Sequence, residues 1–189
     1  MSFGIREYSE PMNNAISTAL HRRTLLFSAA SNDGGNSGRA FPAKYPSVFC
    51  MHSTDGLGNP SSFNPSADDK DINFSLLGEQ VSSHWPIGTK GHNDNVNTLS
   101  GTSVATPIAA GLAASVLSFV RQQERHNAQE SQLLGPWLKD HHSMDLVLKK
   151  MARRRAGYDY ITAHSLFDDR LTREEIYNQI KDIKRRMYD

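Results

Sequence analysis

The chain has 189 residues, 38% of them hydrophobic, which is enough for one domain core of ordinary size. Its 21 basic and 20 acidic side chains leave a formal net charge of +1, so no electrostatic reason favours nucleic acid or an anionic membrane as a partner. The single cysteine, Cys50, cannot form an internal disulfide, and the first residues lack the apolar stretch of a signal peptide. These features predict a cytoplasmic protein.

The first part of the chain alternates between strand and helix patterns. Residues 1–5 predict a short strand, and residues 10–22 have helical spacing, with Ser9 as a candidate N-cap. Three short apolar runs are typical of buried strands, and polar stretches rich in turn formers separate them. These runs are residues 24–30, 47–52 and 72–76. The pattern predicts an α/β fold with a parallel sheet covered by helices.

An apolar run over residues 104–120 is short for a membrane span, so a core helix buried on every side is predicted instead. Beyond residue 122 the chain becomes more polar. Residues 143–155 have helical spacing, and their basic cluster at 149–155 is interpreted as a solvated helix face. A last helix is predicted over 172–187, with a capping box from Thr172 to Glu175. We therefore divide the chain into residues 1–122 and a helical extension, 123–189.

Residues 99–107 place Ser103 at the start of the long apolar helix, after Ser100 and Gly101. Serine is a weak nucleophile at neutral pH and needs a base, together with donors that stabilise the oxyanion. Free N–H groups and the positive dipole end at a helix start help to meet the second need. Two other interpretations are weighed. The serines and Thr102 could simply cap the helix. A nucleophile elbow would need glycine at position 105, which is alanine.

Five segments resemble the subtilisin-like serine peptidases. Residues 101–107, Gly-Thr-Ser-Val-Ala-Thr-Pro, match every fixed position of the family's Gly-Thr-Ser-x-Ala-x-Pro motif. Residues 25–34 resemble its strand ending in Ala-Ala-Gly-Asn, with serine in place of the glycine. Residues 1–4, 41–48 and 72–79 resemble its Met-Ser-x-Gly, Pro-Ala-x-Tyr-Pro-x-Val and Ala-Pro-Gly-Glu segments. The resemblance implies a three-layer, parallel-sheet subtilisin-like fold that begins partway through the catalytic domain.

The resemblance also implies roles for individual residues. Ser103 would be the nucleophile, and the side-chain amide of Asn32 would donate to the oxyanion, although an isolated Asn-Asp-Gly is more often a turn. The residues expected to line the substrate groove are Ser2, Phe3, Gly4, Ala29, Ala30, Ser31, Gly101 and Thr102. The implied substrate is a protein or peptide. No metal or other cofactor is expected, because the acidic run at 68–71 lacks the alternating ligand pattern of a calcium loop.

The family's aspartate and histidine motifs, Asp-Ser/Thr-Gly and His-Gly-Thr, occur nowhere in the sequence. The family places both before the Met-Ser-x-Gly strand. His52 is interpreted as a core or rim residue, and His84 and His92 as exposed. Ser103 therefore has no predicted base. The leading hypothesis is the nucleophile and oxyanion half of a serine endopeptidase. The alternative is an inactive subtilisin-like remnant that acts as a binding or regulatory module.

Overall fold

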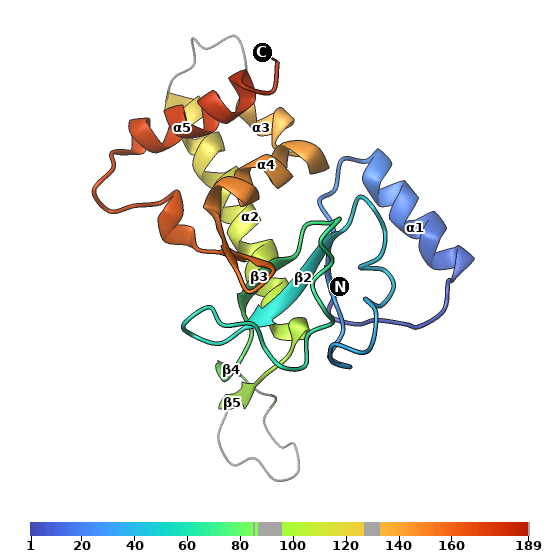
Figure 1. The fold of residues 1–189 in the computed structure, drawn as a ribbon. Helices are drawn as coiled ribbons and strands as arrows, with labels where there is room; N and C mark the ends of the chain where they lie inside the picture. Colours follow the sequence, from blue (N-terminus) through green and yellow to red (C-terminus); the bar gives the residue numbers. More distant parts are fainter. Residues whose placement is uncertain (85, 87–95, 127–132, 189) are drawn as a thin grey trace.

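A computed structural model describes residues 1–84, 86, 96–126 and 133–188. Five strands form the main sheet, in the order β1-β2-β3-β7-β6 (Figure 1). Strands β1 (Phe27–Ala29), β2 (Phe49–Thr54), β3 (Phe74–Leu77) and β7 (Tyr158–Ile161) are parallel neighbours, and β6 (Ala152–Arg155) pairs with β7 in the antiparallel sense. The predicted α/β class with a mainly parallel sheet is confirmed.

The strands predicted from apolar runs are present, with shifted ends. Residues 24–30, 47–52 and 72–76 overlap β1, β2 and β3, respectively. The prediction of a strand over residues 1–5 is wrong, because only its two ends pair with other segments. The Met1 ammonium donates to the Phe27 carbonyl oxygen (2.5 Å) and the Met1 carbonyl accepts from the Ala29 N–H (3.1 Å), while Ile5 forms an isolated bridge with Phe41.

Helix α1 (Glu10–His21) begins after Ser9, as predicted, with proline in its first turn. Ser9 has extended backbone angles, but its side chain makes no capping hydrogen bond to any described residue. Only Ile16 of this helix is fully buried. Helix α1 is therefore a peripheral element, and the long helix α2 (Thr102–His126) contributes much more to the core.

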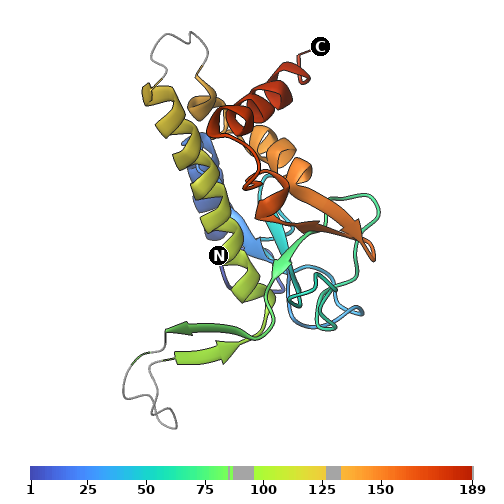
Figure 2. The ribbon, with the colours of Figure 1, turned by 90° about the vertical axis from the view of Figure 1, so that its left-hand side faces the viewer.

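Helix α2 packs across β1, β2 and β3, along one face of the sheet (Figure 2). The prediction that it is buried on every side is wrong. Ala105, Ala109 and Val116 face the sheet, whereas Pro107 and Gly111 are exposed on the opposite side. The helix is also longer than the predicted apolar run, and by length and composition alone it could cross a membrane. Such a test is weak evidence for a single helix, and here one face lies on the sheet.

The C-terminal part contains α3 (Leu134–Trp137), α4 (His141–Met151), the hairpin of β6 and β7, η1 (Ala163–Ser165) and α5 (Arg173–Arg185). The helix predicted over 143–155 ends at Met151, and the following residues form strand β6, which corrects the helical interpretation of the basic cluster. The predicted capping box is confirmed, because Thr172 and Glu175 each accept from the other's backbone N–H.

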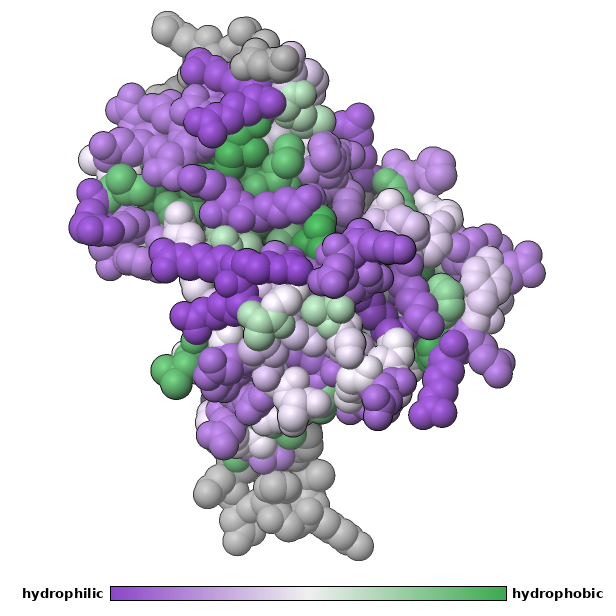
Figure 3. Space-filling view, in the orientation of Figure 1, coloured by the Kyte–Doolittle hydropathy of each residue, from purple (hydrophilic) through white to green (hydrophobic). Residues whose placement is uncertain are grey.

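Strands β4 (Val81–His84) and β5 (Val96–Leu99) form a separate antiparallel ribbon that projects from the body of the molecule (Figure 2). Hydrophilic residues predominate on the face shown in Figure 3, and hydrophobic residues are visible between the helices of its upper part. One buried cluster joins α2 and the sheet to α3, α4 and α5. The division at residue 122 remains a prediction, but a strand from beyond it belongs to the main sheet.

Candidate active site

The candidate site lies where the parallel strands end. Asn32 follows β1 by three residues, and Gly78 comes directly after β3. Gly101 precedes α2, and Ser103 is the second residue of that helix. Because the carboxyl ends of parallel strands meet at one edge of the sheet, loops distant in sequence converge there. Residues 31–32, 78 and 101–103 are brought together at this edge.

Hydrogen bonds fix the orientation of the Asn32 amide. Its Oδ1 accepts from the backbone N–H of Thr102 at 2.8 Å and from Thr102 Oγ1 at 3.0 Å. The same hydroxyl lies 3.2 Å from the Ser31 carbonyl oxygen. Because Oδ1 is held by Thr102, the Nδ2 group of Asn32 points away from it. That group makes no hydrogen bond to any described residue, so its protons are available to a ligand.

The side chains of Ser103 and Asn32 approach each other over Gly101, which has no side chain of its own. Its φ is +155°, a conformation that glycine adopts far more readily than other residues. A Cβ atom at this position would lie 2.9 Å from Ser103 Oγ and 3.0 Å from Asn32 Nδ2. The hydroxyl and the amide donor therefore face the same point above the Gly101 backbone. A substrate carbonyl placed there would contact both groups.

Gly78 is in contact with the chain at Gly101 and helps to hold it in place. The sequence analysis assigned no such role to Gly78. Its carbonyl accepts from the Gly101 N–H at 2.8 Å. A Cβ on Gly78 would lie 2.5 Å from Ser53 Oγ and 2.8 Å from the Gly101 carbonyl oxygen. Ser53 is itself held by Ser61 Oγ at 2.8 Å and by two bonds to Asn64. The signal in the sequence was a glycine directly after the third strand, because only a residue without a side chain allows Ser53 and Gly101 to come this close.

The predicted groove residues differ in their placement. Ser31 adjoins Thr102, while Ala29 and Ala30 are buried beneath the site. Residues 2–4 are exposed, and no hydrogen bond joins them to Asn32 or Ser103 within the described part of the chain. A Cβ on Gly4 would instead meet Ala40 at 2.5 Å. The groove-lining role of all these residues stays a prediction.

Ser103 Oγ has no hydrogen-bond partner among the described residues, so no base activates it there. His52 is fully buried in β2, with Nδ1 3.0 Å from the Phe74 carbonyl oxygen. Burial and the nearby Arg39 charge lower the pKa of His52 to about 4. His84 is exposed in β4, and His92 lies outside the described residues. The described residues contain no group of His, Cys, Asp and Glu suited to a metal ion.

Fold and site together define an α/β protein with a serine at the amino end of its long core helix and an asparagine amide beside it. The model of the subtilase family matches residues 1–155. Subtilisin-like protease het-Q2 of Podospora anserina is 30% identical over 162 residues, which are 83% of this chain and 43% of the relative. Subtilisin of Bacillus pumilus is 30% identical over 121 residues, or 62% of this chain and 41% of the relative.

Solved structures agree on the fold. Patellamide maturation protease PatA superposes with a TM-score of 0.66 at 22% identity, covering 96% of this chain and 62% of that structure. Prenylagaramide maturation protease PagA gives 0.64 at 22% identity, with 95% and 60% covered. This chain belongs to the subtilase family. It spans less than half the length of the curated relatives given above.

Proposed function

We propose that this chain forms the nucleophile and oxyanion half of a serine endopeptidase that hydrolyses peptide bonds in proteins. The convergence of Ser103 Oγ and Asn32 Nδ2 above Gly101 carries the proposal. The family membership supports it, because the matched relatives are named as proteases. The base that deprotonates Ser103 would come from polypeptide outside this sequence, which contains neither family motif for it.

In this mechanism Ser103 Oγ attacks the carbonyl carbon of the scissile bond and loses its proton to the added base. The carbonyl oxygen becomes an oxyanion and accepts from Asn32 Nδ2 and from the backbone N–H of Ser103. N–H groups in the first turn of a helix lack an intrahelical acceptor, and the helix dipole favours negative charge there. Thr102 acts as a positioning residue, because it turns the Asn32 amide toward the oxyanion.

A fluorophosphonate probe, which reacts only with an activated serine, tests the proposal. We expect no appreciable labelling of the chain alone. We expect labelling when the chain is extended with any preceding coding sequence that supplies the histidine and aspartate motifs. Ser103→Ala should abolish that labelling. Ser115→Ala should preserve it, because Ser115 lies on the exposed face of α2, where its hydroxyl donates to the Gly111 carbonyl.

Asn32→Ala in the extended, unlabelled protein should lower kcat by about 10²–10³-fold, the general cost of losing one oxyanion donor, for which subtilisin is the reference case. Thr102→Val should lower kcat by less, because Nδ2 would remain present but less well oriented. An undiminished rate in Asn32→Ala would contradict the proposed oxyanion site.

The competing function is a non-catalytic binding or regulatory module. The absence of a partner for Ser103 Oγ among the described residues favours it. An extended protein that carries both motifs and still does not label at Ser103 would support this alternative over the peptidase.

A further inference from the structure

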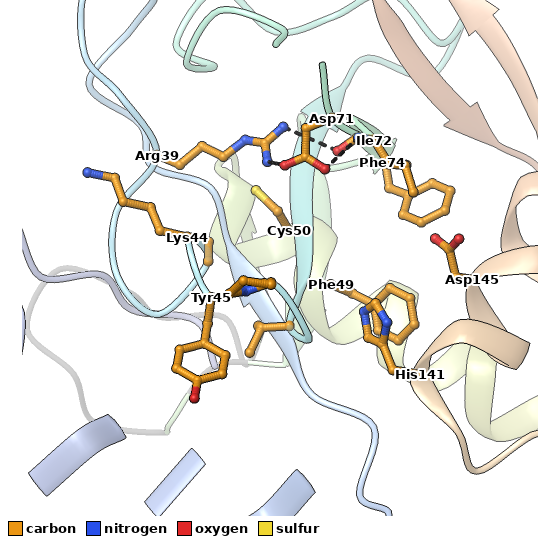
Figure 4. Close-up of a pocket in the computed structure, with 13 residues that line it drawn as sticks. Arg39, Lys44, Tyr45, Phe49, Cys50, Asp71, Ile72, Phe74, His141 and Asp145 are labelled. Carbon is orange, nitrogen blue, oxygen red and sulfur yellow. Dashed lines mark hydrogen bonds and ion pairs between the residues drawn. The ribbon is translucent and has the colours of Figure 1, made fainter. Parts of the chain in front are cut away.

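A second pocket lies at the opposite edge of the sheet from Ser103. It has a volume of about 240 Å³ and opens between the first residues of β2 and β3, the loop at 39–46 and helix α4 (Figure 4). Phe49 and Phe74 are the first residues of their strands, whereas the Ser103 site lies beyond the strand ends. The two sites are thus separated by the length of a strand, roughly 17–20 Å for six residues.

Aromatic and aliphatic groups form the walls of this pocket. The ring of His141 stacks on Phe49, with ring centroids 4.2 Å apart and an interplanar angle of 21°. Burial lowers the pKa of His141, so its ring is neutral at neutral pH. Val48 and Ile72 add aliphatic surface. Cys50 also lines the pocket, but burial raises its thiol pKa to about 12, which leaves it protonated and unreactive.

The two cations that line the pocket are paired or directed elsewhere. The Arg39 guanidinium pairs with Asp71 and donates to the Ile72 carbonyl oxygen at 3.2 Å and to Asn73 Oδ1 at 2.8 Å. Figure 4 shows Lys44 directed away from the centre of the pocket, and its Nζ lies 5.5 Å from the Phe41 ring centroid. Neither cation therefore demands an anionic ligand.

One carboxylate oxygen in the wall of this pocket lacks a hydrogen-bond donor. The Asp145 side chain is 6% exposed, and its Oδ2 lies 2.9 Å from Lys149 Nζ. Its Oδ1 is buried and has no hydrogen-bond partner in the described part of the structure. The carboxylate extends from α4 toward Phe74 (Figure 4). A buried carboxylate oxygen without a donor is costly, so such an atom calls for a partner.

We propose that this pocket binds a primary ammonium group carried on a small apolar body. A rotation of the Asp145 side chain opens Oδ1 to the pocket, Oδ1 accepts from the ammonium, and the rings of Phe49 and Phe74 pack against the body. A cavity of about 150 Å³ holds benzene, so the present volume accommodates a ring with a short amine arm. The charge-assisted bond supplies specificity for the amine.

Benzylamine is a suitable probe, and benzyl alcohol is its neutral counterpart of similar shape. Each is titrated into the full chain while the ring resonances of Phe49, Phe74 and His141 are followed by NMR. We expect saturable shifts with benzylamine and at least tenfold weaker binding of benzyl alcohol. Absence of saturable shifts, or equal affinity for the two compounds, would overturn the proposal, because the ammonium group would then contribute nothing to binding.

Asp145→Asn retains the shape of the side chain and removes its charge. We expect it to weaken benzylamine binding at least tenfold while leaving benzyl alcohol unchanged. Asp182→Asn, on the exposed surface of α5, is the matched control and should bind benzylamine as the unaltered chain does. Unchanged affinity in Asp145→Asn would refute the assignment. If that variant fails to fold, the comparison of the two probes on the unaltered chain still decides. Neither readout depends on hydrolysis at Ser103.

Discussion

Ser31 occupies a conformation that favours glycine, next to the proposed oxyanion donor. Its φ is +147°, and its Oγ accepts from the Asp33 N–H at 3.1 Å. The hydroxyl thus stabilises the turn that presents Asn32, while the Cβ atom strains it. The sequence marked this position as a departure from the family's glycine, but only the backbone angle shows why glycine suits it.

A pair of substitutions separates the strain from the hydrogen bond. Ser31→Gly and Ser31→Ala both remove the hydroxyl, but only glycine relaxes at this φ. We expect Ser31→Gly to be the more stable of the two, by about 1 kcal/mol in urea unfolding. Equal unfolding free energies would show that the backbone at residue 31 is not strained.

His52 makes the stability of the fold depend on pH. Its pKa is lowered to about 4 in the folded chain, from 6.5 when unconstrained, so the unfolded state binds more protons between these values. Stability is therefore complete above about pH 6.5 and is lost as the pH falls toward 4. At pH 5 we expect a loss of about 2 kcal/mol relative to pH 7 from this residue.

Urea unfolding at pH 7 and pH 5 measures this loss. In His52→Asn the amide can still donate to the Phe74 carbonyl, but it does not titrate. The part of the slope of unfolding free energy against pH that comes from residue 52 should therefore vanish. His141, whose pKa is also lowered, adds to the slope in both proteins. His21→Asn, at an exposed position at the end of α1, is the control and should retain the full dependence. An identical pH dependence in His52→Asn would refute this account.

At the scale of elements, predictions from local sequence patterns were right where tertiary packing favours the same structure. The capping box at Thr172 and the apolar strands were predictable because the residues that determine each of them lie within the element itself. The chain at 152–155 was not, because arginine is a good helix former and continues the spacing of α4. Pairing with Tyr158–Ile161 overrides that preference. Burial of α2 on one side only also depends on the neighbouring elements, which its composition does not show.

The turn between β6 and β7 contains two residues with positive φ, Ala156 at +45° and Gly157 at +87°. Two-residue hairpin turns of this kind prefer Asn-Gly. We expect Ala156→Asn to stabilise the chain by about 0.5–1 kcal/mol, because asparagine tolerates this region better than alanine. Thermal unfolding measures the change. Ala163→Asn, at an exposed position outside the hairpin, is the control, and a Tm gain no larger for Ala156→Asn would contradict the turn assignment.

In the candidate site, the residues proposed to take part in the reaction were predictable from the sequence. The residues that hold them in position were not. Ser103 and Asn32 stand in a motif whose spacing is visible in the sequence. The close contact of Gly78 with Ser53 and Gly101 joins three segments, so it appears only after folding. The same holds for the pocket at Asp145, which depends on α4 lying over the start of β2 and β3.

At the scale of the whole molecule, the core crosses the predicted boundary. Leu134, Leu138 and Met144 are fully buried in the cluster that contains Phe49 and Phe74. A chain that ends at residue 122 loses these contacts and strand β7. We expect it to show no cooperative thermal transition by circular dichroism. A chain that ends at residue 185 removes only a short C-terminal tail and should unfold as the full chain does. A cooperative transition for residues 1–122 would instead establish that part as an independent domain.

The arginines of β6 affect whether another strand can pair with the free edge of the main sheet. Arg153, Arg154 and Arg155 are exposed on the outermost strand, where unpaired N–H and C=O groups would otherwise invite a further strand. Arg154 pairs with Asp159 and Arg155 donates to the Leu57 carbonyl, which holds both close to the surface. A second copy approaching edge to edge would bring like charges together. The basic cluster thus protects the β6 edge from strand-by-strand association between chains.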